Sequence, residues 1–383
     1  MSLASPRSAP LDQSNKIKVM IVDDSVVIRG LIGRWLEALP DIEVVARCRD
    51  GQDAVNTISR VKPDVVVLDI EMPVMDGLTA LPKILAACPT ARVLMASTLT
   101  RRNASISIKA LTLGATDYVP KPESTRNGHA SADFQQDLID KIRAVSGKSA
   151  AQPKPRRTFA AERTAAAEGK TIAAVPSRAP FQLKPASRVQ PKILAIGSST
   201  GGPKALFDFF SALSPSLDNI PVVVTQHMPP TFTAILAEHL TACSNRECRE
   251  GADGMILEPG KIYVAPGGKH MVLEAKDGKT QIRLDDGAPV NFCKPAVDPM
   301  LDSLIPIYGP AILVCILTGM GHDGRDASAR VQEQGGTILA QDEASSVVWG
   351  MPGAVAQAGV CHQVLPLSDL PGAASKLIKG VRK

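Results

Sequence analysis

Residues 64–70 read DVVVLDI, an almost unbroken apolar run that contains an aspartate near its end. Similar runs lie on either side of it: IKVMIVDD at 17–24, VVARC at 44–48, RVLMAST at 92–98 and ATDYVPKP at 115–122. Each run is followed by ten or more residues whose apolar positions have helical spacing. Short apolar strands that alternate with helices are typical of a parallel sheet with helices on both faces. Residues 17–146 are therefore predicted to form one α/β domain.

The same alternation returns from residue 191. Four further apolar runs predict buried parallel strands: PKILAIGSS at 191–199, IPVVVTQH at 220–227, PAILVCILTG at 310–319 and GTILAQD at 336–342. Residues 260–286 instead alternate and contain glycine turns, which predicts an antiparallel ribbon outside the sheet core. Residues 191–383 are therefore predicted to form a second α/β domain, doubly wound and mostly parallel, with an antiparallel β ribbon.

The segment between the two domains has a different composition. Residues 147–190 are rich in Ala, Pro, Ser and Thr, and only Glu162 and Glu168 oppose their many basic side chains. This composition favours a flexible basic linker, and an anionic docking segment is the functional alternative. Residues 1–16 are polar and contain proline, so they are predicted to be disordered.

Overall composition excludes several classes of protein. The net charge is only +5 over 383 residues, which does not indicate nucleic-acid binding. The seven cysteines are scattered without a CxxC pair, which argues against a disulfide framework and a zinc site. No signal-peptide core and no apolar run of about 18 residues is present. We therefore expect a cytoplasmic protein without membrane insertion.

Polar side chains gather at the strand ends of the first predicted domain. Asp23 and Asp24 end the first strand, Asp69 ends another, Ser97 ends RVLMAS, and Lys121 follows ATDYVP. The carboxyl ends of parallel strands share one edge of the sheet, where ligands bind. Clustered carboxylates favour a hard cation such as Mg²⁺, and an aspartate neutralised in this way can act as a nucleophile and form an acyl phosphate. Each aspartate alone would more often be a turn former or a helix cap.

The motifs VDDS, LDIEMPVMDG, MAST and DYVPKP, at these separations, resemble the response-regulator receiver family over residues 18–143. The resemblance implies a flavodoxin-like fold in which Asp69 accepts a phosphoryl group. It further implies a Mg²⁺ site formed by Asp23, Asp24, Asp69 and the Glu71 backbone carbonyl. The residues that change position on phosphorylation, the switch, would be Ser97, Tyr118 and Lys121.

The second domain opens with a strand, a glycine-flanked turn and a helix, in ILAIGSSTGGPKALFDFF at 193–210. A hydroxyl in such a turn lies at a helix N-terminus, where a developing anion is favoured. The turn fits either a phosphate-binding loop or a nucleophile loop. Its glycine spacing matches neither phosphate-loop motif, and it does not match G-x-S-x-G either.

A histidine and an aspartate end two other predicted strands of this domain. His227 directly follows the strand in VVVTQH, and Asp323 follows the strand that precedes TGMGHDG. Taken singly, a hydrogen-bonded structural histidine and a turn aspartate are the ordinary explanations. Together with a serine, they supply the nucleophile, base and orienting carboxylate of a triad, which is recognised by geometry and not by sequence order.

The motifs IGSSTGG, TQHMP and TGMGHDG behind a receiver resemble the catalytic domain of the chemotaxis protein-glutamate methylesterase family, over residues 191–370. The resemblance implies Ser199 as nucleophile, His227 as base and Asp323 as orienting residue. It also implies Met320 as an oxyanion donor and Thr200 as a neighbour. NFCKPAVDPM at 291–300 resembles a family segment near the site, although Lys294 stands where arginine is expected.

The two resemblances imply a phosphorylation-controlled hydrolase for chemotaxis adaptation. It would remove methyl groups from glutamate methyl esters on chemoreceptors and deamidate selected receptor glutamines, with a chemotaxis histidine kinase as phosphodonor. Mg²⁺ would serve the receiver, and the ester chemistry would need no cofactor. A receiver-coupled transcription factor would carry a compact basic helix-turn-helix, and a dinucleotide enzyme would carry the G-x-G-x-x-G fingerprint; neither pattern is found after residue 190.

Overall fold

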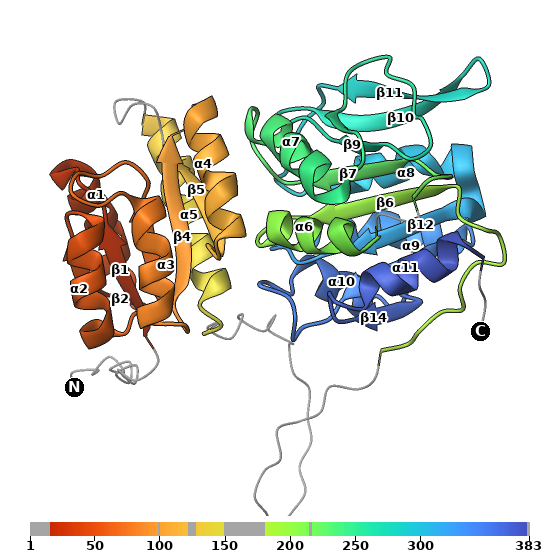
Figure 1. The fold of residues 1–383 in the computed structure, drawn as a ribbon. Helices are drawn as coiled ribbons and strands as arrows, with labels where there is room; N and C mark the ends of the chain where they lie inside the picture. Colours follow the sequence, from red (N-terminus) through yellow and green to blue (C-terminus); the bar gives the residue numbers. More distant parts are fainter. Residues whose placement is uncertain (1–15, 99, 122–127, 149–180, 214–216, 381–383) are drawn as a thin grey trace, which may run out of the picture.

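The computed structural model describes residues 16–98, 100–121, 128–148, 181–213 and 217–380. The prediction for residues 1–15 and most of the predicted linker, residues 149–180, lie outside the described residues. Two sheet-based units lie side by side, each with helices on both faces of its sheet (Figure 1). No helix within the described ranges is both long and apolar enough to cross a membrane.

The first unit is a five-stranded parallel sheet in the order β2-β1-β3-β4-β5. Its elements are β1 (Ile17–Val22), α1 (Val26–Glu37), β2 (Ile42–Cys48), α2 (Gly51–Val61), β3 (Val65–Asp69), α3 (Gly77–Ala87), β4 (Arg92–Thr98), α4 (Arg101–Thr112), β5 (Asp117–Lys121) and α5 (Gly128–Val145). This is the flavodoxin-like order, whose ligand crevice lies between β1 and β3.

The alternation of side chains along the strands explains how the helices of this unit pack, and helix caps explain where they begin. Side chains of one strand face pack against α1 and α5, while those of the other face pack against α2, α3 and α4. The first four helices each begin after a side chain that accepts a hydrogen bond from a first-turn N–H, namely Ser25, Asp50, Asp76 and Thr100. These caps satisfy donors that a helix start leaves unpaired. The caps therefore fix where the loops after the strands end.

The second unit is a seven-stranded parallel sheet in the order β14-β13-β12-β6-β7-β9-β8, with β10 and β11 as a separate antiparallel ribbon. Its elements are β6 (Ile193–Ser198), α6 (Gly202–Leu213), β7 (Val222–Gln226), α7 (Phe232–Ser244), β8 (Cys248–Glu250), β9 (Ile262–Val264), β10 (His270–Lys276), β11 (Lys279–Asp285), α8 (Val297–Tyr308), η3 (Gly309–Ala311), β12 (Ile312–Ile316), α9 (Arg325–Glu333), β13 (Thr337–Gln341), α10 (Met351–Gln357), β14 (Gln363–Leu365) and α11 (Leu370–Ile378).

The central strands β6, β7 and β12 are buried on both faces, as their continuous apolar runs predict. Helices α6, α7 and α11 cover one face, and α8, α9 and α10 cover the other. The predicted fold class, two α/β units with an antiparallel ribbon beside the second sheet, is therefore confirmed. The carboxyl ends of β6, β7 and β12 meet at one edge, which gathers the loops that carry the serine, the histidine and the aspartate.

Two details differ from the sequence prediction. Residues 262–264, assigned to the ribbon, form β9 of the parallel sheet, between β7 and β8. Residues 181–190, assigned to a flexible linker, lie against the second unit. There the Lys184 N–H donates to the Cys361 carbonyl, and the Ser187 hydroxyl donates to the Pro310 carbonyl. Hydrogen bonds to backbone carbonyls hold these residues in place, and amino-acid composition carries no signal for them.

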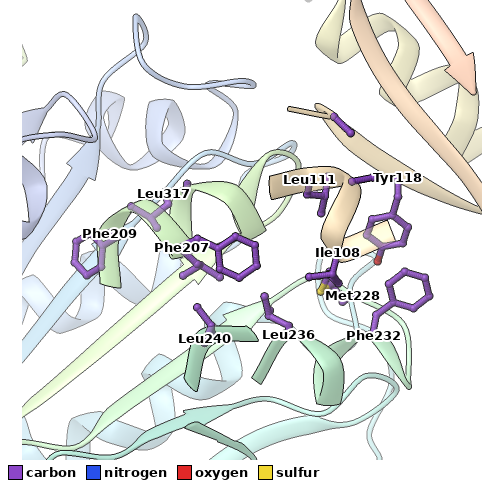
Figure 2. Packing of buried hydrophobic residues seen from close by; sticks show 14 of the residues in the cluster. Ile108, Leu111, Tyr118, Phe207, Phe209, Met228, Phe232, Leu236, Leu240 and Leu317 are labelled. Carbon is purple, nitrogen blue, oxygen red and sulfur yellow. The ribbon is translucent and has the colours of Figure 1, made fainter. Parts of the chain in front are cut away.

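The two units contact each other through α4 and β5 on one side and α6 and α7 on the other. Apolar side chains from both units form one cluster, which includes Ile108, Leu111, Tyr118, Met228, Phe232 and Leu236 (Figure 2). The rings of Tyr118 and Phe232 are stacked, with centroids 4.4 Å apart and an interplanar angle of 10°. At the rim, a guanidinium nitrogen of Arg101 lies 2.9 Å from a carboxylate oxygen of Glu238. We call this contact the interdomain interface.

Candidate functional site

The loop after β6 is shaped by glycines that approach their neighbours closely. A Cβ on Gly202 would lie 2.0 Å from the side-chain oxygen of Gln226, and Gly201 has φ of +74°. Ser198 is fully buried, and its hydroxyl donates to Gln226 Oε1 at 2.7 Å. Ser199 is half-buried, directly before the buried Thr200, and leads into α6. Of the two adjacent serines, Ser199 is therefore the one whose hydroxyl is left for chemistry at a helix N-terminus.

His227 lies next to this loop because β6 and β7 are paired in parallel. Ser198 is in register with Gln226, and the His227 N–H donates to the Ser198 carbonyl at 3.1 Å. On its other side, the His227 ring nitrogen Nε2 is 2.8 Å from Asp323 Oδ2. The structure thus brings together the three strand ends that carry Ser199, His227 and Asp323.

Asp323 is 1% exposed and accepts five hydrogen bonds. Two of the donors, the N–H groups of Val297 and Asp298, belong to the first turn of α8, at 2.6 and 3.2 Å. Such first-turn donors have no partner within the helix and favour a negative charge. Although burial opposes ionisation, the hydrogen bonds from His227 and Val297 lower the pKa of Asp323. The carboxylate is therefore charged and fixed before any substrate arrives.

Asn291 and Asp298, in the segment 291–298, complete this network, and the sequence did not single them out. The Asn291 amide donates to Asp323 Oδ1 at 3.0 Å and to Asp298 Oδ2 at 2.9 Å. Asp298 Oδ1 in turn accepts from the Ala327 N–H in the first turn of α9. The only sequence signal for this segment was its likeness to a family segment near the site. Lys294, where arginine was expected, binds Asp286 at 2.8 Å, and in the described parts of the chain no hydrogen bond or ion pair joins its side chain to His227 or Asp323.

Cys293 contacts the second ring nitrogen of His227. Its Sγ is 3.3 Å from His227 Nδ1. Burial disfavours a charged ring, but the hydrogen bonds to Asp323 and Cys293 outweigh it and raise the pKa of His227 to about 9. With Nε2–H donated to Asp323, Nδ1 is the nitrogen that faces away from the carboxylate and can take up a proton. In the described parts of the chain no hydrogen bond joins Ser199 to His227, and the Cys293 thiol is the group that contacts Nδ1.

Met320 lies beside the serine loop. A Cβ on the preceding residue, Gly319, would lie 2.9 Å from Ser199 Cβ, so the two backbones are in close contact. The Gly319 N–H donates to the Val348 carbonyl, while no backbone hydrogen bond from the Met320 N–H is found among the described residues. A backbone N–H without such a partner next to Ser199 is the type of donor that an oxyanion requires.

The first unit places its three predicted metal carboxylates together. Oxygens of Asp23, Asp24 and Asp69 lie within 4.8 Å of one another. Lys121 Nζ is 2.6 Å from Asp23 Oδ2 and 2.7 Å from Asp69 Oδ1. Burial raises the pKa of Asp69 to about 6, partly opposed by Lys121. One ammonium thus faces three clustered carboxylates, and an all-oxygen donor set with excess negative charge fits Mg²⁺.

The other predicted receiver residues differ in their surroundings. The hydroxyls of Ser97 and Ser107 are hydrogen-bonded at 2.9 Å in the buried interior. Tyr118 is 3% exposed and lies in the interdomain interface (Figure 2). Glu71 is exposed, and its carboxylate lies 3.9 Å from Arg102. A cavity of about 410 Å³ adjoins Asp24 and Glu71.

The two sites are connected through the interdomain interface. Met228, which packs in that interface, directly follows His227. A cavity of about 230 Å³ lies between the units, and its lining includes Thr116 of the first unit and Gly201 and Thr318 of the second. Gly201 belongs to the serine loop, so the first unit lies close to the catalytic loops.

Comparisons with known proteins agree with both halves of this description. Residues 19–133 match the family model described as response regulator receiver domain, and residues 194–374 match the one described as CheB methylesterase. The crystal structure of the Thermotoga maritima CheB methylesterase catalytic domain is 41% identical in sequence, with a TM-score of 0.48. It aligns over 49% of this chain and all of that one.

Full-length relatives carry one name. A protein-glutamate methylesterase/protein-glutamine glutaminase of Rhodopseudomonas palustris (strain BisB5) is 51% identical over 100% of this chain and 99% of its own length. A protein of the same name from Nitrobacter hamburgensis is 52% identical over 99% of this chain and 97% of its own length. Identity at this level along the whole chain covers both units and the segment between them. The chain therefore belongs to the protein-glutamate methylesterase/protein-glutamine glutaminase family.

Proposed function

We propose that Ser199, His227 and Asp323 carry out the hydrolysis of glutamate methyl esters and the deamidation of glutamines that are characteristic of this family. The observation that carries the assignment is the hydrogen bond between His227 Nε2 and the buried Asp323 carboxylate, beside the loop that holds Ser199. The substrates are methylated chemoreceptors.

In this mechanism the Ser199 hydroxyl replaces the Cys293 thiol at His227 Nδ1. The serine oxygen forms a bond to the ester carbonyl carbon while its proton passes to Nδ1, and Asp323 stabilises the resulting imidazolium. The Met320 N–H and the N-terminus of α6 face the negative carbonyl oxygen. The imidazolium then protonates the methoxy oxygen, and methanol leaves. Water attacks the acyl-enzyme by the same route and releases glutamate; with a glutamine substrate, ammonia leaves instead.

The receiver unit supplies control of this activity by phosphorylation. We assign Asp69 as the acceptor of a phosphoryl group from a chemotaxis histidine kinase. Asp23, Asp24, Asp69 and the Glu71 carbonyl would hold Mg²⁺, which supplies positive charge next to the phosphoryl oxygens. Lys121, now shared between Asp23 and Asp69, would bind the phosphoryl group, as would the Ser97 hydroxyl. Tyr118 links these changes to Phe232 in the interdomain interface.

The assignment of the nucleophile is tested by comparing the two adjacent serines. Methanol release from methylated receptor membranes should be abolished in Ser199→Ala. Ser198→Ala should retain substantial activity, because the Ser198 hydroxyl is buried and donates to Gln226. Circular dichroism of both variants checks that the fold persists. The opposite pattern, with an inactive Ser198→Ala and an active Ser199→Ala, would refute the assignment.

A further inference from the structure

Residues 290–293 form a tight hairpin turn beside the candidate active site. The Val290 N–H donates to the Cys293 carbonyl at 3.0 Å, and the Cys293 N–H donates to the Val290 carbonyl at 2.9 Å. The two residues between them, Asn291 and Phe292, have φ of +51° and +63°. A two-residue turn with positive φ at both positions is of type I′, in which asparagine followed by glycine is preferred. Asn291 follows this preference, whereas Phe292 occupies the position that favours glycine.

No packing of the Phe292 side chain against the described residues offsets the strain of its backbone. Its side chain has a relative exposure of 101%, so no part of the described chain covers the ring. A bulky residue with positive φ is a true outlier, whereas glycine adopts the same conformation without penalty. Such outliers cluster at functional sites, where the observed strain leads to a hypothesis of function.

The neighbours of Phe292 fix the position of its backbone. On one side, the Asn291 amide donates to Asp323 and Asp298. On the other side, Cys293 Sγ contacts His227 Nδ1. Both adjacent side chains therefore point into the catalytic network, and the turn between them presents the Phe292 ring to solvent at its border. The ring is exposed while the receiver unit is in place, so docking of the receiver does not cover it.

We propose that Phe292 is a substrate-contact residue, whose ring packs against an apolar side chain of the protein segment that carries the reacting glutamate. The proposal rests on the function proposed above. A protein substrate has residues next to its glutamate, and these must lie along the border of the site while the ester reaches Ser199. An exposed aromatic ring on a fixed backbone is well suited to bind them, because only its few side-chain torsions have to be ordered on binding.

The test compares two substrates that share the reacting group. Methylated receptor membranes contain the neighbouring residues, and N-acetylglutamate 5-methyl ester lacks them. The quantity compared is the ratio of kcat/KM for the receptor membranes to kcat/KM for the small ester. In the full chain with Mg²⁺ and acetyl phosphate, we expect Phe292→Ala to lower this ratio about tenfold, as the loss of one buried aromatic contact predicts. Phe292→Leu should recover part of this loss.

Phe292→Gly separates substrate binding from folding. It should lower the same ratio as strongly as alanine does, yet raise the thermal unfolding midpoint by about 2–4 °C because glycine relieves the positive φ. Ile256→Ala, at an exposed apolar residue that lines the cavity at the opposite edge of the sheet, is the matched control and should leave the ratio unchanged. An unchanged ratio in Phe292→Ala would overturn the role of Phe292 and leave the proposed function standing. Activity of Ser199→Ala on both substrates would instead overturn the proposed function.

Discussion

Asp323 joins the chemistry of the site to its architecture. The same carboxylate holds the His227 ring and accepts the first N–H groups of α8, while Asp298 at that helix start accepts an N–H of α9. A strand-end aspartate is ordinarily explained as a structural cap. The contacts of Asp323 support both this explanation and a catalytic role. A helix terminus is a fixed dipole, so the orientation of the base does not depend on a mobile side chain.

Replacing Asp323 by asparagine should lower turnover on the order of 10³–10⁴-fold, as the loss of an orienting carboxylate does in other triads. The amide removes the charge that stabilises an imidazolium, and its NH₂ group faces donors such as the Val297 N–H. Steady-state methanol release measures the effect. Asp326→Asn is the control, because Asp326 is exposed and binds Arg325. Near-normal turnover in Asp323→Asn would contradict the assignment.

The pH dependence should reveal the surroundings of His227. Its hydrogen bonds to Asp323 and Cys293 favour the protonated ring against burial and raise its pKa to about 9. Only the neutral ring accepts the serine proton, so kcat/KM should rise with pH along a limb centred near pH 9 and level off above it. Cys293→Ala removes one of these interactions and should shift the limb to lower pH. A limb at the ordinary histidine value near 6.5, or one that Cys293→Ala leaves in place, would contradict this account.

At the scale of elements, the strands that carry the sites could be predicted because their apolar runs are long and unbroken. β3, β6, β7 and β12 each end at or near a polar residue of a candidate site. The short strands β8 and β9 could not be predicted, because β8 is Cys-Arg-Glu and β9 is Ile-Tyr-Val, too few residues for a period to be seen. β9 is placed by its pairing with β7, and β8 by its pairing with β9, and both pairings are tertiary contacts.

The catalytic network was only partly predictable for a similar reason. The positions of Ser199, His227 and Asp323 follow from strand ends that meet at one sheet edge. Asn291 and Cys293 come from an irregular segment after the ribbon. Their approach to the site depends on how that segment folds back to start α8, and no local pattern states this.

The interdomain interface can be probed at its rim, away from both sites. Arg101 on α4 and Glu238 on α7 form an exposed ion pair at 2.9 Å. Reversing one charge with Arg101→Glu should loosen the interface and raise the unphosphorylated activity about two- to fivefold, in line with the small energies of surface pairs.

The double variant Arg101→Glu with Glu238→Arg should return the unphosphorylated rate towards that of the parent chain, since it restores opposite charges. Arg60→Glu, on the exposed surface of α2, controls for the change in net charge. Equal rates for the single and double variants would show that these two side chains do not meet in solution.

At the scale of the whole molecule, the arrangement of the units links the two chemistries. The receiver presents α4 and β5 to α6 and α7, and Tyr118, on the same strand as Lys121, stacks on Phe232 (Figures 1 and 2). Met228 in the same contact adjoins His227. A change at Asp69 that moves Ser97, Lys121 and Tyr118 would therefore act on the packing next to the catalytic loops. This is a shift between docked and released populations, without new chemistry.

The most direct test of this account is methanol release from methylated receptor membranes by the full chain and by a fragment of residues 181–383. The fragment keeps the residues that pack against the second sheet. The account predicts that the unphosphorylated full chain is slowest, that Mg²⁺ and acetyl phosphate raise its rate, and that the fragment is fast without either. Asp69→Asn should keep the full chain at its low rate under all conditions. A fragment slower than the unphosphorylated full chain would contradict restraint of the hydrolase by its receiver.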